Sequence, residues 1–288
     1  MNKLNPVSKG RDFYLMQYFI RLYRLINILS IDVAVGAVAC TLFFAKIFDV
    51  EVLPFGLISL ALTVWIIYTA DHLLDAYKIQ QPASTERHRF HQQHFKLLLV
   101  CLLLAAAVDA IQLIFIRKIV LVEGFALAIV ITIYFLLHRY LKFFKEVIGA
   151  VLYCGGVLLI PWSLKNDGIT IHHLLLIAQF AITALINLFL FSWFGIDQDI
   201  KDEHSSFATV MGEQATKYSI AILFFVQGAI TLVLLAFGFA ILLPAITLFT
   251  MNALLFILLT NKKYFEENDR YRLLGDAVFF LPLIYVLI

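Results

Sequence analysis

The chain has 288 residues, of which 62% are hydrophobic, 15% aromatic and 15% charged. Soluble domains carry roughly 45–50% apolar and about 25% charged residues, so this composition excludes a water-soluble, disordered or fibrous protein. The formal net charge is only +2, and we expect no nucleic-acid partner. Three cysteines are far apart and form no CxxC pair, which argues against a zinc cluster or a disulfide framework. The composition predicts a polytopic membrane protein.

Nine segments are long and apolar enough to cross a hydrocarbon core of about 30 Å, which needs about 20 residues of helix. They are residues 25–46, 53–74, 95–116, 119–138, 146–164, 171–195, 216–238, 240–260 and 272–288. Residues 1–24 lack the apolar core of a cleavable signal peptide. We interpret them as a cytoplasmic or interfacial lead-in, in which residues 12–24 form an amphipathic helix. No composition break divides the chain, so the sequence predicts one all-α domain over residues 1–288.

The basic residues predict the orientation of this domain. Of the 22 Lys and Arg residues, 18 fall in the N-terminal tail and in the loops after even-numbered spans. The other four are Lys46, Arg117, Lys118 and Lys165. Cytoplasmic loops carry an excess of Lys and Arg. We therefore expect a cytoplasmic N-terminus and, with nine spans, an external C-terminus, in a membrane of the bacterial inner-membrane type.

Acidic residues gather where two inward-running spans end. The second span ends in YTADHLLDAYK, where Asp71 and Asp75 share a helix face because they are spaced i,i+4. The sixth span ends in WFGIDQDIKDEHSSFATVMG. If its helix continues, Asp199 and Asp202 share one face and Asp197 points away from it. The orientation above places both groups at the cytoplasmic membrane surface.

A cation explains these acids better than solvation of the helix ends does. A carboxylate at a helix C-terminus opposes the macrodipole by about 0.3–1 kcal/mol, so basic residues would be expected there instead. A hard cation such as Mg²⁺ binds carboxylates together with phosphate oxygens. The sequence therefore predicts a Mg²⁺ site at this surface.

Basic residues in the neighbouring loops could bind the phosphates. Arg87 and Arg89 lie in STERHRFHQQHFK after the second span, and Lys142 and Lys145 lie in HRYLKFFKE after the fourth. Arg and Lys are the usual phosphate-binding side chains. The general excess of basic residues on the cytoplasmic side explains them equally well when they are considered alone.

These features together resemble the UbiA superfamily of intramembrane prenyltransferases. The shared features are nine helices, an Asp motif closing the second helix, another closing the sixth, and a basic loop after each. KEVIGAVLYCGG and SSFATVMGEQATKY are similar to the family's fifth-helix start and to its stretch after the second motif. Ile67 and Tyr68 stand where the family's first motif begins with Asn-Asp. Two registers of the second motif stay open, with either Asp199 or Asp202 as its last Asp.

The resemblance implies a Mg²⁺-dependent transfer of an isoprenoid chain from an allylic diphosphate to an aromatic or lipid acceptor. Such a reaction belongs to quinone, pigment or lipid biosynthesis. The expected metal ligands are Asp71, Asp75, Asp197, Asp199 and Asp202, of which Asp71, Asp75, Asp199 and Asp202 are the expected catalytic residues. The expected substrate-binding residues are Arg87, Arg89, Lys142, Lys145, Tyr68 and Asp32. Membrane lipid is the surrounding partner, and no protein partner is predicted.

Three other interpretations stay open to different degrees. A cation-coupled transporter would also use paired acids, but transporter sites lie near the membrane midplane. A terpene cyclase of the UbiA type would need the same ionisation without a separate acceptor. A di-iron membrane enzyme is disfavoured because the chain has no HxxHH box. We assign no role to Asp109 and Glu123, and we expect Asp276 to pair with Arg272.

Overall fold

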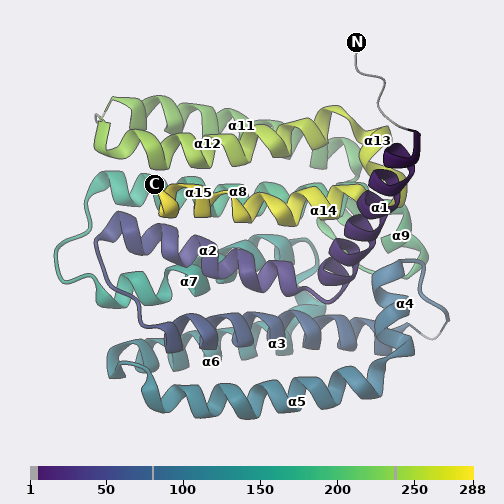
Figure 1. The fold of residues 1–288 in the computed structure, drawn as a ribbon, viewed down its shortest axis with the longest axis horizontal. Coiled ribbons are helices and arrows are strands. Elements are labelled where there is room, and N and C mark those ends of the chain that lie inside the picture. The colour runs from purple at the N-terminus through teal and green to yellow at the C-terminus, as the bar shows by residue number, and fades with distance from the viewer. Residues whose placement is uncertain (1–5, 80, 237–238) are drawn as a thin grey trace.

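The computed structural model describes residues 6–79, 81–236 and 239–288, with side chains described from residue 17 onward apart from a few positions. Within these residues the chain forms helices and no strand. Eight helices are long and apolar enough to cross a membrane, and they run side by side (Figure 1). They are α2 (Ile31–Phe48), α3 (Pro54–Lys78), α5 (Phe95–Gln112), α6 (Lys118–Leu141), α7 (Lys145–Leu164), α8 (Ile171–Phe194), α11 (Glu213–Leu235) and α12 (Phe239–Thr260).

The ninth predicted span is interrupted. It consists of α14 (Arg270–Ala277), the 3₁₀ turn η4 (Val278–Phe280) and α15 (Pro282–Leu287), which follow one another in line beside the long helices (Figure 1). Proline supplies no backbone N–H, and its ring crowds the preceding helical turn, so Pro282 explains the break. The predicted count of nine is therefore approximate in the described chain, as eight unbroken helices and one interrupted segment.

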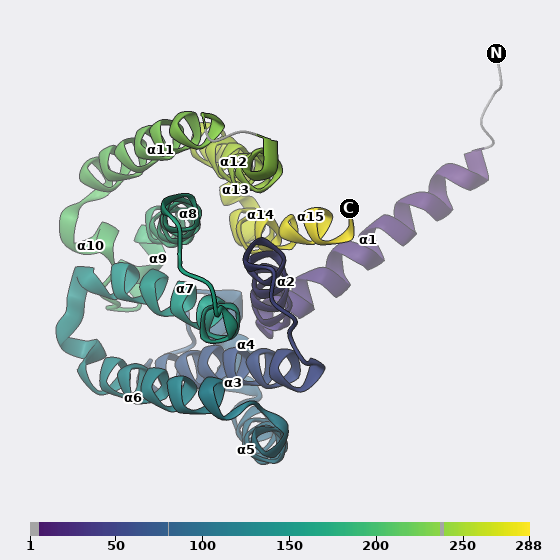
Figure 2. The same ribbon diagram turned by 90° about the vertical axis from the view of Figure 1, so that its left-hand side faces the viewer.

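Helix α1 (Pro6–Ile28) and four short helices gather at one end of the bundle, which we call the motif end. The short helices are α4 (Glu86–Gln93), α9 (Ile196–Lys201), α10 (Phe207–Met211) and α13 (Lys262–Glu266). Figure 2 looks along the bundle and shows α1 extending away from it. Tyr18 and Phe19 of α1 are exposed, so the residues expected to form an interfacial lead-in are helical and present aromatic side chains outside the bundle.

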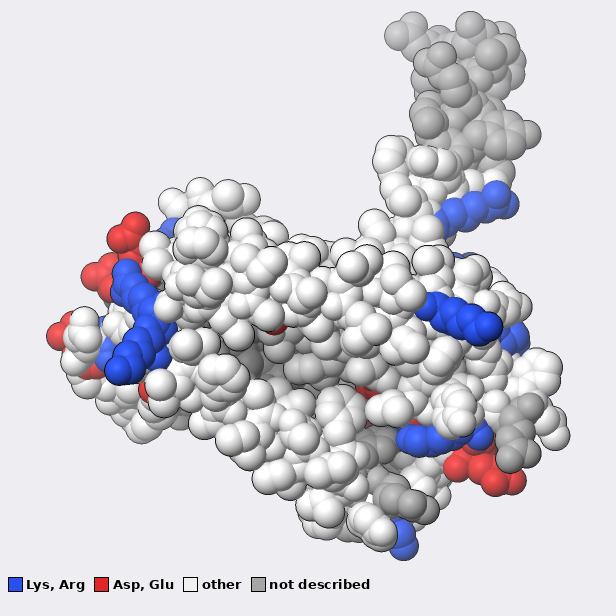
Figure 3. All heavy atoms as spheres, turned by 90° about the horizontal axis from the view of Figure 1, so that it is seen from below, with Lys and Arg blue, Asp and Glu red and all other residues white. Residues whose placement is uncertain are grey.

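The core lies around α2, α7 and α8. Phe43, Phe44 and Phe48 of α2 are fully buried, and the ring of Phe44 lies 5.3 Å from that of Phe180 in α8. By contrast, most side chains of α5 and α6 face outward. Figure 3 shows charged side chains at the two ends of the molecule and an uncharged band between them. This distribution matches a hydrocarbon core flanked by water, and the chain is an integral membrane protein.

A glycine permits the closest approach between two of the helices. A Cβ at Gly275 of α14 would lie 2.5 Å from both Asn187 Oδ1 and Phe191 Cε1 of α8. Such contacts are well inside van der Waals separation. Gly275 therefore allows α14 to pack directly against α8 near the motif end.

Candidate functional site

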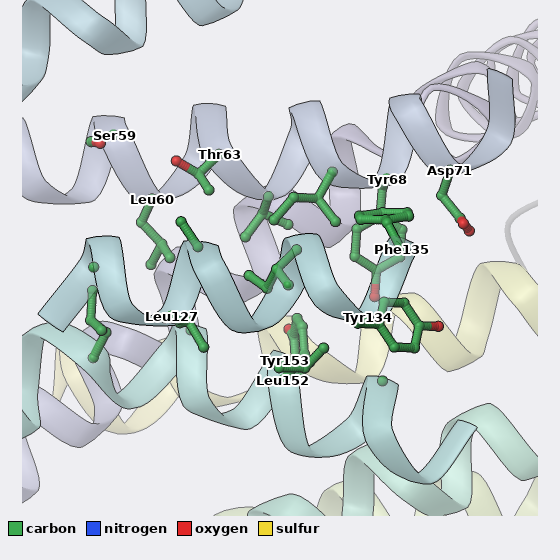
Figure 4. Close-up of a pocket in the computed structure, with 18 of the residues that line it drawn as sticks. Ser59, Leu60, Thr63, Tyr68, Asp71, Leu127, Tyr134, Phe135, Leu152 and Tyr153 are labelled. Atoms are coloured by element: carbon green, nitrogen blue, oxygen red, sulfur yellow. The ribbon is translucent and has the colours of Figure 1, made fainter. Parts of the chain in front are cut away.

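A cavity of about 450 Å³ lies between α3, α6 and α7, with α5 and η1 (Leu113–Phe115) on one side. Figure 3 shows a hollow in the uncharged band, with acidic atoms visible inside it. Figure 4 shows side chains of α3, among them Leu60, Tyr68 and Asp71, directed toward Leu127 of α6 and Leu152 of α7. Most of the wall is apolar, and most of its ionisable residues are at the motif end. These are Asp71, Asp75, Lys145, Glu146 and His204, together with Tyr68 and Tyr134, whereas Asp109 and Tyr153 line the deeper part.

Asp71 and Asp75 both line the cavity, as their i,i+4 spacing predicted. Asp71 is partly buried and Asp75 is buried. Asp75 Oδ1 accepts a hydrogen bond from Lys78 Nζ at 3.0 Å. These carboxylates oppose the dipole at the C-terminal end of α3, and Lys78 compensates part of that unfavourable charge.

His204 brings the second acid-rich segment to the same cavity. Its Nε2 lies 3.7 Å from Asp75 Oδ2, and its backbone N donates to Asp199 O at 2.7 Å. Burial lowers the pKa of His204, and the positive charge of Lys145 lowers it further, although Asp75 acts in the opposite direction. Burial and Lys145 thus favour the neutral form of His204.

None of the three predicted acids of the second motif is among the residues that line the cavity. Asp197 is exposed, and Asp199 is partly buried. Asp202 accepts hydrogen bonds from the backbone N of Ser84 at 3.2 Å and from its hydroxyl at 2.7 Å. Asp202 therefore fastens the loop between α3 and α4 to the end of α9.

Of the four predicted phosphate-binding residues, Lys145 lines the cavity. Lys142 is exposed at the end of α6, where its φ of 42° lies in the left-handed region. Arg89 donates to the carbonyl oxygens of Ala83 and Ser84 and so supports its own loop. The structure thus places one of the four side chains in the cavity wall.

Arg87 and Asp32 belong to a buried polar cluster beside the cavity. The Asn27 side chain donates to Asp32 Oδ2 at 2.5 Å and to Asp276 Oδ2 at 2.7 Å. Arg87 Nη2 donates to Asn27 Oδ1 at 2.9 Å and lies 3.8 Å from Asp276. Arg272, the partner expected for Asp276, instead donates to the Tyr271 hydroxyl at 3.1 Å. The cluster joins α1, α2, α4 and α14.

Two further acidic residues line the cavity, although the sequence interpretation assigned them no role. Glu146 of α7 is buried, its Oε1 accepts from Phe207 N at 2.7 Å, and its Oε2 has no hydrogen-bond partner. An acid in the first turn of a helix is ordinary, so its sequence position gave no signal. Asp109 of α5 also lines the cavity and accepts from the Thr63 hydroxyl at 2.8 Å.

The carboxylates present fit a Mg²⁺ ion that shares its ligands with phosphate. No three His, Cys, Asp or Glu side chains in the described chain are grouped closely enough to hold a metal. Mg²⁺, however, commonly binds one or two carboxylates and takes its other ligands from substrate phosphates and water. Asp71 and Asp75 supply two carboxylates at the cavity, so this set fits one ion bound together with a phosphorylated ligand.

Comparisons with known proteins define the fold. No protein-family model matches the sequence, and no curated protein shows significant similarity to it. Among solved structures, the chain is similar to a UbiA homolog from Archaeoglobus fulgidus that was determined with DMAPP and Mg²⁺ bound. The TM-score is 0.54 at 14% identity, over 87% of this chain and 98% of the other. The chain therefore has a UbiA-like fold, which confirms the predicted fold class.

Proposed function

We propose that the protein is a Mg²⁺-dependent prenyltransferase, which moves an isoprenoid chain from an allylic diphosphate to an acceptor within the membrane. The observation that carries this proposal is the shape of the cavity. Three acidic residues, a lysine and a histidine stand at its motif end, and a mostly apolar wall continues from them between membrane-spanning helices. An isoprenoid diphosphate has the same arrangement, with one charged end and one apolar chain. The DMAPP and Mg²⁺ bound to the Archaeoglobus homolog add support.

The charged end of the donor fits the motif end of the cavity. Asp71 and Asp75 would hold Mg²⁺ against the diphosphate, and the metal would neutralise the negative charge of the leaving group. Lys145 adds a positive charge in the same wall. Preorganised charge of this kind stabilises the leaving group while the C–O bond breaks.

The reaction requires two further contributions from the protein. When the C–O bond breaks, its electron pair leaves with the diphosphate, and an allylic cation forms that the aromatic faces of Tyr68 and Tyr134 can stabilise by about 0.5–2 kcal/mol each. The acceptor then attacks this cation and loses a proton. The neutral form of His204 is favoured, and its side chain lies at the same end of the cavity, so we assign His204 as the base that accepts this proton.

The proposal includes an orientation with the motif end in the cytoplasm. The basic residues favour this orientation through the positive-inside rule. The donor would then enter from the cytoplasmic side, and the acceptor would be a lipid-soluble aromatic or lipid molecule of quinone, pigment or lipid biosynthesis.

A binding titration tests the proposal without knowledge of the acceptor. The purified protein in detergent is titrated with a non-hydrolysable geranylgeranyl diphosphate analogue, with and without Mg²⁺. We expect binding that requires Mg²⁺ and that falls at least about tenfold in Asp71→Asn, because a metal ligand is lost. Asp197→Asn removes an exposed acid outside the cavity wall and should bind normally. Mg²⁺-independent binding, or equal binding by both variants, would contradict the proposal.

A further inference from the structure

The cavity has a length that can be measured along its three main helices. The residues that line it run from Asp75 to Gly56 on α3, from Phe135 to Val120 on α6, and from Lys145 to Ile160 on α7. The pair on α3 is separated by 19 residues and the other two pairs by 15, which at about 1.5 Å per residue corresponds to about 28 Å and about 22 Å. Beyond the turn of α3 that carries Asp71 and Asp75, all three helices therefore give a depth of about 22 Å, which covers most of a hydrocarbon core of about 30 Å.

The wall formed by α6 and α7 suits an extended hydrocarbon. Beyond the motif end most of its residues are aliphatic, among them Leu127, Ala128, Ile131 and Leu152, and the wall also includes Phe125 and Tyr153. Apart from the Tyr153 hydroxyl, the polar side chains at this depth belong to the opposite side, formed by α3 and α5. There the Thr63 hydroxyl and the Asp109 carboxylate are hydrogen-bonded to each other.

Two glycines keep the deep part of this wall open. Gly156 of α7 lies 11 residues from Lys145, and Gly124 of α6 lies 11 residues from Phe135. Both are therefore about 16 Å from the motif end. A Cβ at Gly156 would have no atom within 4 Å, and one at Gly124 would meet only Leu159 at 3.6 Å. A larger side chain at Gly156 would enter the cavity at this depth.

From this geometry we infer that the donor carries four isoprene units, as in geranylgeranyl diphosphate, and that Gly156 leaves the space for the last unit. This inference rests on the proposed function and specifies its donor. Each isoprene unit adds four carbon–carbon bonds of about 1.5 Å, which in a zigzag chain extend about 5 Å. Four units then extend about 20 Å and fill the cavity, whereas three units end near Gly156.

The test compares the affinities of four non-hydrolysable analogues, the dimethylallyl, geranyl, farnesyl and geranylgeranyl diphosphates, for the full-length protein with Mg²⁺. We expect the affinity to rise at least about tenfold with each added unit up to geranylgeranyl, because each unit buries further apolar surface. A fifth analogue, with five isoprene units, should gain nothing, and a further gain of about tenfold would overturn the limit of four units. Equal Mg²⁺-dependent affinity for all four analogues would overturn the inference and leave the proposed function intact. Failure of all four to bind would overturn both.

Two glycine variants test whether Gly156 sets the length of the isoprenoid chain that the cavity accepts. Gly156→Leu should move the best-bound analogue from geranylgeranyl to farnesyl or geranyl, with a change of at least about tenfold in their affinity ratio. Gly228→Leu of α11 is the matched control, because a Cβ there also meets nothing within 4 Å and Gly228 is not among the residues lining the cavity. An unchanged ratio in Gly156→Leu, or the same shift in Gly228→Leu, would show that Gly156 does not set the chain length.

Discussion

The imidazole Nε2 of His204 lies 3.7 Å from the Oδ2 of Asp75, although the two residues are far apart in the sequence. The pair joins the end of α3 to the segment that follows α8, so that both acid-rich stretches contribute to one cavity. His204 reaches the cavity from the loop between α9 and α10, and Asp75 from the last turn of α3. The site therefore brings three acidic residues and a histidine together.

If His204 accepts the proton of the acceptor, its substitution affects turnover more than donor binding. We expect His204→Ala to lower kcat by about 10²–10⁴-fold and to change the affinity for the donor much less. The neutral form is the active one, and the pKa of His204 is lowered. Wild-type activity should therefore fall only below the ordinary histidine range, near pH 6.5.

The dependence of activity on pH supplies the control for the assignment of His204 as the base. The acidic limb that His204 causes should be absent from the residual activity of His204→Ala. An unchanged limb in the variant would show that another group titrates there.

Two roles are open to Asp202, a structural contact with Ser84 and a metal ligand, and variants of both residues distinguish them. Because it accepts hydrogen bonds from Ser84, we expect Asp202→Ala and Ser84→Ala each to destabilise the loop by about 1 kcal/mol. The double variant should be little worse than Asp202→Ala alone, since Asp202→Ala already removes the bond from the Ser84 hydroxyl as well as the bond from its backbone N. Thermal unfolding in detergent measures this coupling. Loss of Mg²⁺-dependent donor binding in Asp202→Ala, but not in Ser84→Ala, would instead identify Asp202 as a metal ligand.

Asn27 holds together the buried cluster at the start of α2. Asn27→Ala would leave Asp32, Asp276 and Arg87 without hydrogen bonds to the Asn27 side chain in a buried setting. Unsatisfied buried charges are strongly destabilising, so we expect a loss of about 3 kcal/mol or more.

The measurement is the apparent Tm in detergent, which should fall by several degrees. Asn166→Ala, in an exposed loop, serves as the control and should leave the Tm unchanged. Equal stability of the two variants would mean that the cluster contributes little to folding.

Substitution of Gly275 tests the close packing of α14 on α8. Gly275→Ala places a methyl group 2.5 Å from Asn187 Oδ1 and Phe191 Cε1, and we expect overpacking to lower the stability by about 1–3 kcal/mol. Gly228→Ala, which meets no neighbour, should be neutral or stabilising by up to about 1 kcal/mol, since alanine favours helix more than glycine does. A stabilising effect in both would contradict the packing described here.

Local pattern was enough to predict the long helices and the first acid pair. Asp71 and Asp75 lie on one unbroken helix, so their spacing predicted that they face the same way, and both line the cavity. The second motif could not be predicted in the same way. The helix α8 ends at Phe194, and Gly195 departs from helical geometry with a ψ of 2°, so the face assigned to Asp199 and Asp202 does not continue across the break.

Long-range contacts explain the other difference between sequence and structure. The place of Arg87 in a basic loop predicted a phosphate-binding residue, and the structure adds that Arg87 hydrogen-bonds to Asn27, 60 residues earlier, and lies beside Asp276. Neither neighbour can be inferred from periodicity. The depth of the cavity was also inaccessible from sequence because it depends on how α3, α6 and α7 are placed relative to one another.

The most direct test of the central claim replaces Mg²⁺ with Mn²⁺ and records the electron paramagnetic resonance of the bound ion. With the geranylgeranyl diphosphate analogue present, we predict one bound Mn²⁺ per chain. We also predict that the bound signal is lost in Asp71→Asn and Asp75→Asn and retained in Asp197→Asn. A bound signal that persists in Asp71→Asn, or that is independent of the diphosphate, would contradict a donor site at these carboxylates and favour a cation-coupled transporter.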